Sequence, residues 1–265
     1  MQRYLHLHLR DTERTARRRA AAAPISLLLA LLLLLAACGA AATAGTVPHA
    51  TPTATVHPPV VYVALGASDA VGVGASDPNT QGYVPILISR LPTYSQAFNY
   101  GVSGYTLRQA LQGELPQALA QHPSLITIWL VGNDFKGCVP LAQYAADLDN
   151  LLGQLQAHTT ARVFVANAPD FSQLPYFQQG AQGGAACVVG QPPAAIRALT
   201  QQWNAVINPL VARHGDVLVD LFNSNLANHP ELVSSDGFHP SSAGYLALAN
   251  LFWAQITAHG GVPAS

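Results

Sequence analysis

Five residues spread along the chain have side chains or backbone groups suited to nucleophilic catalysis: Ser68, Gly104, Asn133, Asp236 and His239. A serine hydroxyl becomes a good nucleophile only when a neighbouring base removes its proton. A histidine can do this at neutral pH, and a carboxylate beside it fixes its tautomer and stabilises its charged form. Backbone amides beside a glycine, together with an asparagine side chain, can bind the developing oxyanion. These residue types are the set that hydrolysis of an ester by a serine requires.

Alternating apolar runs and amphipathic segments indicate how these residues are positioned. Most of the expected strands are continuous apolar runs, and a helical pattern follows each of them, which is typical of a parallel sheet with helices on both faces. The sequence therefore predicts one α/β domain, a three-layer doubly wound fold with about five parallel strands. The expected strands are residues 60–65, 94–100, 125–131, 162–166 and 217–222, and the main helices are residues 82–91, 106–120, 141–155, 194–213 and 241–258.

The polar residues fall where this sheet would bring them together. Ser68 follows the first strand directly, Gly104 follows the second and Asn133 follows the third. The carboxyl ends of parallel strands meet at one edge of the sheet, and open α/β sheets bind their ligands there. The loop after the fifth strand, which contains Asp236 and His239, reaches the same edge. We therefore expect one site, assembled from four separate segments.

The ordered set of four segments resembles the SGNH (GDSL-type) hydrolases, whose flavodoxin-like fold carries Ser, Gly, Asn and His in four blocks. Gly66-Ala67-Ser68-Asp69 is similar to the first block, and residues 99–104, which read NYGVSG, are similar to the second. Gly132-Asn133-Asp134 is similar to the third block, and residues 236–240, which read DGFHP, are similar to the last. The blocks occur in the family's order and, with the first strand, are spread over residues 60–240, nearly all of the predicted domain.

The resemblance implies a role for each residue of the set. Ser68 would be the nucleophile, His239 the general base and Asp236 the acid that orients it. The oxyanion would be held by the amides of Ser68 and Gly104 and by the side chain of Asn133. The reaction would pass through an acyl-enzyme, and we expect neither a cofactor nor a metal ion.

Two positions depart from the family pattern. The Asp that precedes the serine in the GDS signature is Ala67 here, and the usual Gly two residues before the block-three Asn is Val131. The missing Asp is not a member of the triad, so we expect altered support of the turn rather than lost chemistry. Asp69 and Asp134 adjoin site residues, and each is either a supporting group or a cap of the following helix.

The N-terminus has the features of an export signal. An uninterrupted Leu/Ala run spans residues 27–37 after a cluster of arginines, which suits a signal peptide and is short for a membrane span. The run ends in Leu-Ala-Ala before Cys38, and this resembles the lipobox of bacterial lipoproteins. We therefore expect a signal peptide at residues 1–37, lipidation of Cys38, a tether at residues 38–59 and a folded domain at residues 60–265. The alternative is an ordinary cleavable signal and a secreted protein.

Charge and cysteine content narrow the possible partners. Residues 1–37 contain six arginines and two acidic residues, so their removal changes the net charge from −1 to −5. A domain with one lysine, Lys136, and no basic run is not expected to bind nucleic acid.

Cys138 and Cys187 are the other two cysteines, and in an exported protein they most simply form one disulfide. Two buried free thiols are the alternative.

The leading hypothesis is a lipid-anchored, extracytoplasmic serine ester hydrolase that acts as a monomer on a small-molecule, glycan or lipid ester. One alternative is a non-catalytic surface lipoprotein that uses the same fold to bind cell-wall glycan or another ligand. A flavodoxin-like FMN carrier fits less well, because residues 66–72, which read GASDAVG, make a poor phosphate-binding loop.

Overall fold

The structure is a computed structural model that describes residues 59–178, 187–188 and 190–263. The predicted signal peptide, Cys38 and all but the last residue of the predicted tether lie outside these residues. In the described part of the chain, no helix is both long enough and apolar enough to cross a membrane.

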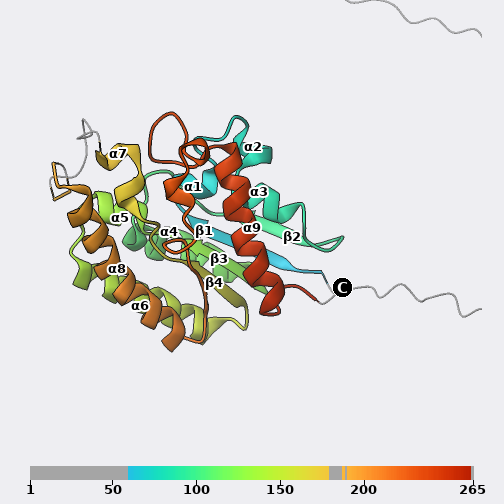
Figure 1. The fold of residues 1–265 in the computed structure, drawn as a ribbon. Coiled ribbons are helices and arrows are strands. Elements are labelled where there is room, and N and C mark those ends of the chain that lie inside the picture. The colour runs from blue at the N-terminus through green and yellow to red at the C-terminus, as the bar shows by residue number, and fades with distance from the viewer. Residues whose placement is uncertain (1–58, 179–186, 189, 264–265) are drawn as a thin grey trace, which may run out of the picture. The chain divides into compact units, whose positions relative to one another are not determined.

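Five parallel strands form a single sheet, as predicted (Figure 1). Their order across the sheet is β2-β1-β3-β4-β5, so the chain moves outward from β1 to β2 and then crosses back to β3. The strand order reverses between β1 and β3, and ligands of doubly wound sheets bind at this switch point. The strands are β1 (Val61–Gly66), β2 (Gln96–Asn99), β3 (Leu125–Trp129), β4 (Arg162–Ala166) and β5 (Val217–Val219).

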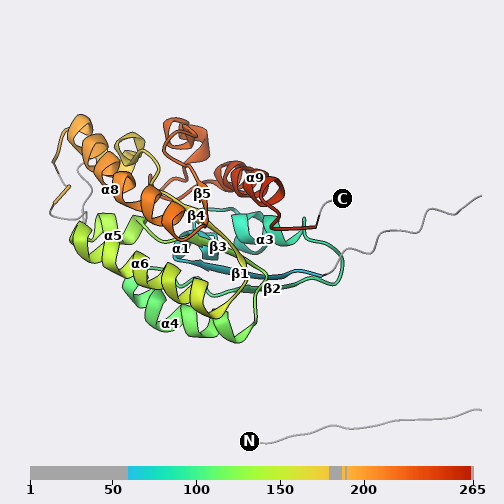
Figure 2. The ribbon, with the colours of Figure 1, turned by 90° about the horizontal axis from the view of Figure 1, so that it is seen from below.

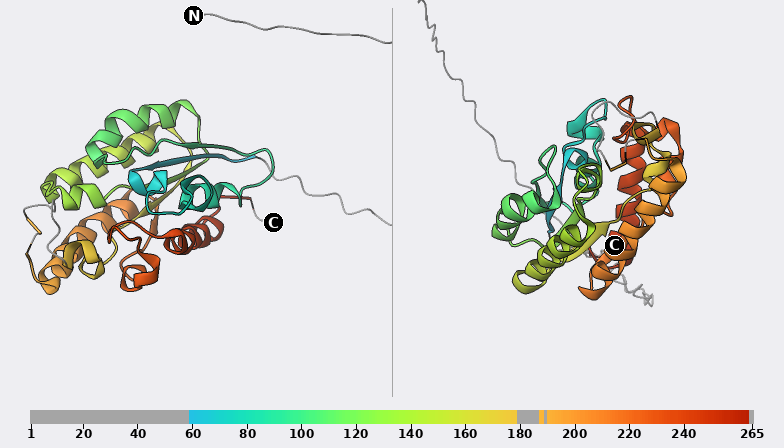
Figure 3. Two further views of the ribbon diagram at one scale, coloured as in Figure 1. Left: turned by 90° about the horizontal axis from the view of Figure 1, so that it is seen from above. Right: turned by 90° about the vertical axis from the view of Figure 1, so that its left-hand side faces the viewer.

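Helices cover both faces of the sheet (Figures 2 and 3). One layer contains α4 (Leu107–Ala120), α6 (Leu141–His158) and α8 (Pro193–Arg213). The opposite layer contains α1 (Ser68–Val71), α3 (Tyr83–Ile88) and α9 (Ser242–Ala258). The short elements are α2 (Pro78–Gln81), α5 (Gly132–Lys136), α7 (Pro175–Gln178) and the 3-10 turns η1 (Phe171–Gln173), η2 (Leu226–Asn228) and η3 (Pro230–Leu232).

The central strand shows why the apolar runs are continuous. Val63 and Leu65 point into the core under α4, α6 and α8, whereas Tyr62 and Ala64 point into the core under α3 and α9. Successive side chains of a strand alternate between the two faces, and here both faces are buried. Every position of β1 from Tyr62 onward is therefore inside the protein.

The last strand is shorter than predicted, and a side chain explains where it ends. Asn167 Oδ1 accepts hydrogen bonds from the amides of Leu221, at 2.7 Å, and Phe222, at 3.3 Å. These amides are therefore engaged by a side chain instead of a strand, and pairing stops at Val219. The sequence also missed the short elements, because a helix of four or five residues is too brief to show a period.

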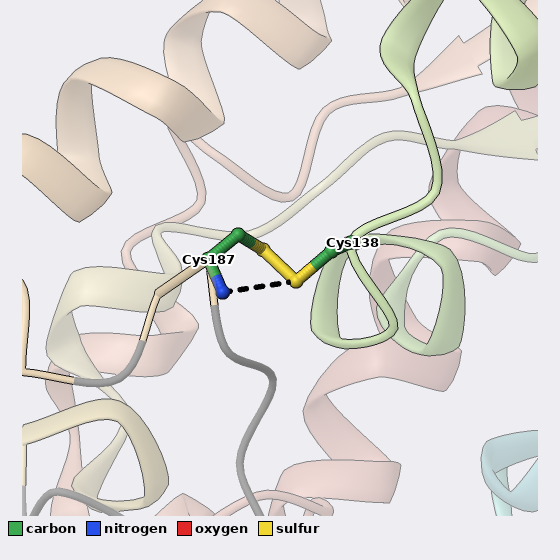
Figure 4. Close-up of a disulfide and its surroundings, with 2 residues drawn as sticks. All are labelled: Cys138 and Cys187. Carbon is green, nitrogen blue, oxygen red and sulfur yellow. Dashed lines mark hydrogen bonds between the residues drawn. A yellow bond between two sulfur atoms is a disulfide. The ribbon is translucent and has the colours of Figure 1, made fainter.

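Cys138 and Cys187 form a disulfide, with their Cα atoms 5.9 Å apart (Figure 4). The amide of Cys187 also donates a hydrogen bond to Cys138 Sγ at 3.1 Å. Cys138 lies just after α5, so the bond ties the segment that carries Asn133 to the chain that leads into α8. The alternative of two free thiols does not describe this structure.

Candidate active site

The end of β1 presents Ser68 at the carboxyl edge of the sheet. Gly66 closes the strand, and Ser68 is the first residue of α1, with 7% of its surface exposed. A Cβ atom on Gly66 would lie 2.7 Å from the Cβ of Ala70, so the tight turn needs a glycine there. The carbonyl of Ala67 accepts from the amides of Ala70 and Val71, which anchors the first turn of the helix.

Ser68, His239 and Asp236 form one chain of hydrogen bonds. The distance from His239 Nε2 to Ser68 Oγ is 2.8 Å, and the distance from His239 Nδ1 to Asp236 Oδ2 is 2.5 Å. When Nδ1 carries the proton and donates it to the carboxylate, Nε2 is free to accept the serine proton. The structure thus brings together three residues that the sequence places up to 171 positions apart.

The loop around Asp236 fixes the carboxylate. Asp236 Oδ1 accepts from the amides of Phe238 and His239, at 2.8 and 2.9 Å, and from Ser234 Oγ at 2.8 Å. Partial burial opposes ionisation, but these bonds and the bond from His239 outweigh it and lower the pKa of Asp236 to about 2. A bridge between Val233 and Pro240 closes the base of the loop. The sequence did not single out Ser234, although serine and aspartate are both common in turns.

The predicted oxyanion donors lie on neighbouring loops. Gly104 has φ of +86°, a left-handed conformation that favours glycine. Asn133 is in the first turn of α5, and its Nδ2 donates to the carbonyl of Tyr105 at 2.9 Å, which ties its side chain to the Gly104 loop. Within the described residues, the amides of Ser68 and Gly104 donate to no protein acceptor. Both amides are therefore available to an external oxygen.

Of the two roles expected for Asp134, a supporting group or a cap of the helix that follows it, the structure shows a supporting group. Its Oδ2 accepts from the amide of Leu107 at 2.8 Å, so it caps α4, the helix that follows Gly104. The side chain is 1% exposed, and burial raises the pKa of Asp134 to about 6. Its bond adds a second link between the segment that carries Asn133 and the Gly104 loop. The sequence identified the residue but could not show its partner, which is 27 residues away.

Asp69 follows Ser68 in the first turn of α1. It lines an apolar cavity that also includes Trp129 and Leu248. Phe238 and Pro240, the residues on either side of His239, line the same cavity. Burial raises the pKa of Asp69 to about 6, and the nearby His239 lowers it in part. The site is therefore bordered by a mainly hydrocarbon surface.

Lys136 and Asp170 lie outside the hydrogen-bonded chain. Lys136 Nζ lies 4.8 Å from the ring centroid of Phe238, the residue before His239. Asp170 is buried and pairs with Arg197 and Ser172, away from the triad. No group of three or more His, Cys, Asp or Glu side chains able to hold a metal ion occurs within the described residues.

The profile of the GDSL-like Lipase/Acylhydrolase family matches residues 64–247. The chain belongs to this family, and it is an ester-hydrolysing enzyme. The resemblance noted from the four blocks is confirmed at this level. No match was found among curated protein sequences.

Solved structures share the fold. TesA is 23% identical, with a TM-score of 0.60 over 75% of this chain and 98% of its own. The extracellular lipase from Streptomyces rimosus is 22% identical, with a TM-score of 0.56 over 74% of this chain and 99% of its own. Axe2, an acetylxylan esterase from Geobacillus stearothermophilus, is 19% identical, with a TM-score of 0.56 over 76% of this chain and 95% of its own. At these identities the likeness shows a common fold.

Proposed function

We propose that the protein is an extracytoplasmic serine ester hydrolase in which Ser68, His239 and Asp236 are the catalytic triad. The observation that carries the proposal is the continuous hydrogen-bonded chain from Ser68 Oγ through His239 to Asp236. Family membership gives the reaction class, and this geometry supports the choice of these three residues. A non-catalytic role on the same fold is not favoured.

In the proposed mechanism, Ser68 Oγ attacks the ester carbonyl carbon while its proton moves to His239 Nε2. The amides of Ser68 and Gly104 and the side chain of Asn133 hold the negative oxygen of the tetrahedral intermediate. The intermediate collapses, the C–O bond to the alcohol breaks, and His239 gives the proton to the departing oxygen. Water then attacks the acyl-serine with His239 as base, which releases the carboxylic acid and restores Ser68.

The experiment that tests the assignment is covalent labelling with a fluorophosphonate, which reacts with activated serines. We expect the purified protein to be labelled stoichiometrically, and mass spectrometry of its peptides to place the phosphonate on Ser68. Labelling at another serine, or no labelling of a protein that hydrolyses p-nitrophenyl acetate, would contradict the triad.

Replacing Asn133 by alanine is expected to lower kcat for p-nitrophenyl acetate by about 10²–10³-fold, because one oxyanion donor is lost. The Michaelis constant should change little, since the charge develops in the transition state. A matched control is Asn150→Ala on the outer surface of α6, where the side chain contacts Gln154. Equal activity of the two variants would exclude Asn133 from the oxyanion site.

The proposed substrate is an uncharged carboxylic ester of a small molecule, lipid or glycan. The apolar cavity beside Asp69 and Phe238 supports a hydrocarbon acyl group. The solved relatives include a lipase and an acetylxylan esterase, so a series of acyl chain lengths on both lipid and sugar alcohols is the appropriate comparison. We also propose a monomer, to be checked by light scattering.

The proposed location is the outer side of the cell membrane, with a lipid on Cys38. The lipobox-like sequence supports this placement, and the Cys138–Cys187 disulfide is of the kind that persists in oxidising compartments. In cells that express the full chain, we expect the wild type in the membrane fraction and Cys38→Ser without incorporated fatty acid. Fatty-acid labelling that persists in Cys38→Ser would contradict lipidation at this residue, and an unlabelled wild type in the medium would indicate secretion.

A further inference from the structure

A buried carboxyl reaches the turn that carries the nucleophile. Glu114, in the middle of α4, is 1% exposed, and its Oε2 accepts a hydrogen bond from the amide of Gly66 at 2.9 Å. Its other oxygen, Oε1, has no partner among the described residues. Glu114 also departs from the pattern of its helix, because it occupies the apolar face with Leu107, Ala110 and Ala118. An acidic residue at a core position needs a specific reason.

The reason lies at the end of β1. Pairing with β2 stops at Ala64 and Asn99, and the carbonyl of Gly66 faces the departing β2 chain, where it accepts from Val102 at 3.2 Å. The amide and the carbonyl of a strand residue point to the same side of the strand. The Gly66 amide therefore points towards the β2 side, where β2 has already ended. A buried amide without an acceptor is costly, and Glu114 supplies the acceptor.

Neither Gly66 nor Ala67 can supply this acceptor from a side chain. Ala67 ends in a methyl group, and its own carbonyl is used by Ala70 and Val71. Gly66 cannot carry a side chain, because of its close approach to Ala70. Residue 67, where the family has an Asp, therefore has no polar side chain in this protein, and the carboxyl of Glu114 reaches the same turn from α4.

The same helix is also linked to the predicted oxyanion donors. It begins at Leu107, three residues after Gly104, and the amide of Leu107 is held by Asp134, beside Asn133. Through Glu114, α4 is bonded two residues before Ser68. One rigid element therefore connects the nucleophile turn, the Gly104 loop and the start of α5.

We infer that Glu114 is a positioning residue that fixes Ser68 relative to the Gly104 amide, in place of support from residue 67. This inference rests on the proposed roles of Ser68 and Gly104. Burial raises the pKa of Glu114 from its ordinary 4.5 to about 8, although the backbone amides of Gly66 and Val102 lower it in part. The group is therefore mostly a neutral acid at pH 7, and glutamine is its closest mimic.

The test compares Glu114→Gln, which keeps an acceptor of the same shape, with Glu114→Leu, which removes it. A displaced nucleophile costs up to about 10²-fold, so we expect Glu114→Leu to lose about 10–100-fold in kcat with little change in KM. The rate of fluorophosphonate labelling should fall by a similar factor. We expect Glu114→Gln to stay within about threefold of wild type in both measurements.

A matched control removes another buried hydrogen bond from the same strand. Tyr62→Phe loses the hydrogen bond between the Tyr62 hydroxyl and Thr127 Oγ1, which are 2.8 Å apart, near the opposite end of β1. We expect this variant to lose stability but to keep kcat. Loss of activity from general loosening of the core would appear in both Tyr62→Phe and Glu114→Leu.

Three outcomes would overturn the inference: wild-type kcat in folded Glu114→Leu, equal losses in the Gln and Leu variants, or an equal loss in Tyr62→Phe. If Glu114→Leu does not fold, Glu114→Asp replaces it, because the shorter side chain withdraws the carboxyl from Gly66. Wild-type kcat in Glu114→Asp would then overturn the inference. Failure of the proposed function is distinguished by the wild type, which would show no label on Ser68.

A pH series adds a second readout. Between pH 4.5 and 8 the folded protein retains the Glu114 proton that the unfolded chain releases, so the contribution of this group to stability falls as pH rises. We expect the wild-type Tm to fall relative to that of Glu114→Gln over this range. Burial raises the pKa of Tyr83, which lies on the opposite face of the sheet, so its hydroxyl stays neutral over this range. A constant difference in Tm would show that the acid does not titrate there.

Discussion

Ser68→Ala is expected to reduce kcat for p-nitrophenyl acetate by at least about 10⁴-fold, because the variant has no nucleophile for acyl transfer. The substitution removes one hydroxyl whose bonding partner is His239 Nε2, so the fold should be preserved. Any residual rate would come from the oxyanion donors acting on a water molecule. Steady-state kinetics and circular dichroism of the same preparation measure both quantities.

The matched control is Ser76→Ala, an exposed serine eight positions along the chain whose hydroxyl donates to no described residue. This variant should retain full activity and full fluorophosphonate labelling. Turnover of Ser68→Ala within tenfold of the wild type would refute the nucleophile assignment, because contamination by wild-type enzyme cannot explain so high a rate.

Asp236→Asn is expected to lower kcat by about 10³–10⁴-fold, through the tautomer of His239. The asparagine carbonyl can take over the bonds that Oδ1 accepts from Phe238, His239 and Ser234, which keeps the loop in place. Its amide group would then face His239 Nδ1 and drive the proton to Nε2. A histidine protonated at Nε2 cannot accept the proton of Ser68.

A second Asp–His pair in the molecule provides the control. Asp149 on α6 contacts His214 Nε2 at 2.7 Å, at the surface between α6 and α8. Asp149→Asn breaks an equivalent pair away from the sheet edge and should leave kcat unchanged. A loss of less than tenfold in Asp236→Asn, with the fold intact, would show that His239 does not depend on this carboxylate.

The lowered pKa of Asp236 sets the lowest pH at which the carboxylate of the Asp236–His239 pair stays charged. Its carboxylate is charged above pH 4, so the stability that its bonds contribute is fully present there and is lost as pH falls towards 2. Any change in kcat between pH 5 and 9 therefore belongs to other groups.

The sequence was sufficient to predict five parallel strands and to select the residues that are proposed as the site. The strand pattern and the site motifs both depend on residues that are close together in the sequence. Tyr62 to Leu65 read as a buried strand because both faces of β1 are covered, and Asp236 and His239 are three residues apart on one turn. The approach of His239 to Ser68 joins distant parts of the sequence. It could still be predicted, because the loops that follow parallel strands all lie at the same edge of the sheet.

The supporting bonds could not be predicted in the same way. The partner of Asp134 is on a helix that precedes it by 27 residues, and the partner of Glu114 is 48 residues away. Nothing in either local pattern specifies which amide, at a helix start or at a strand end, will lack a backbone partner. A glutamate on the apolar face of residues 107–120 was nevertheless a visible signal, because burial of an acid requires a donor nearby.

The position of Lys136 has a practical consequence for following the enzyme in solution. It is the one lysine of the whole chain, and its ammonium group lies over the ring of Phe238, next to the proposed base. An amine-reactive fluorophore would therefore attach to a single side chain of the protein, at the rim of the candidate active site. Its emission would report movements of the loop at residues 236–240 during ester binding, without an engineered attachment point.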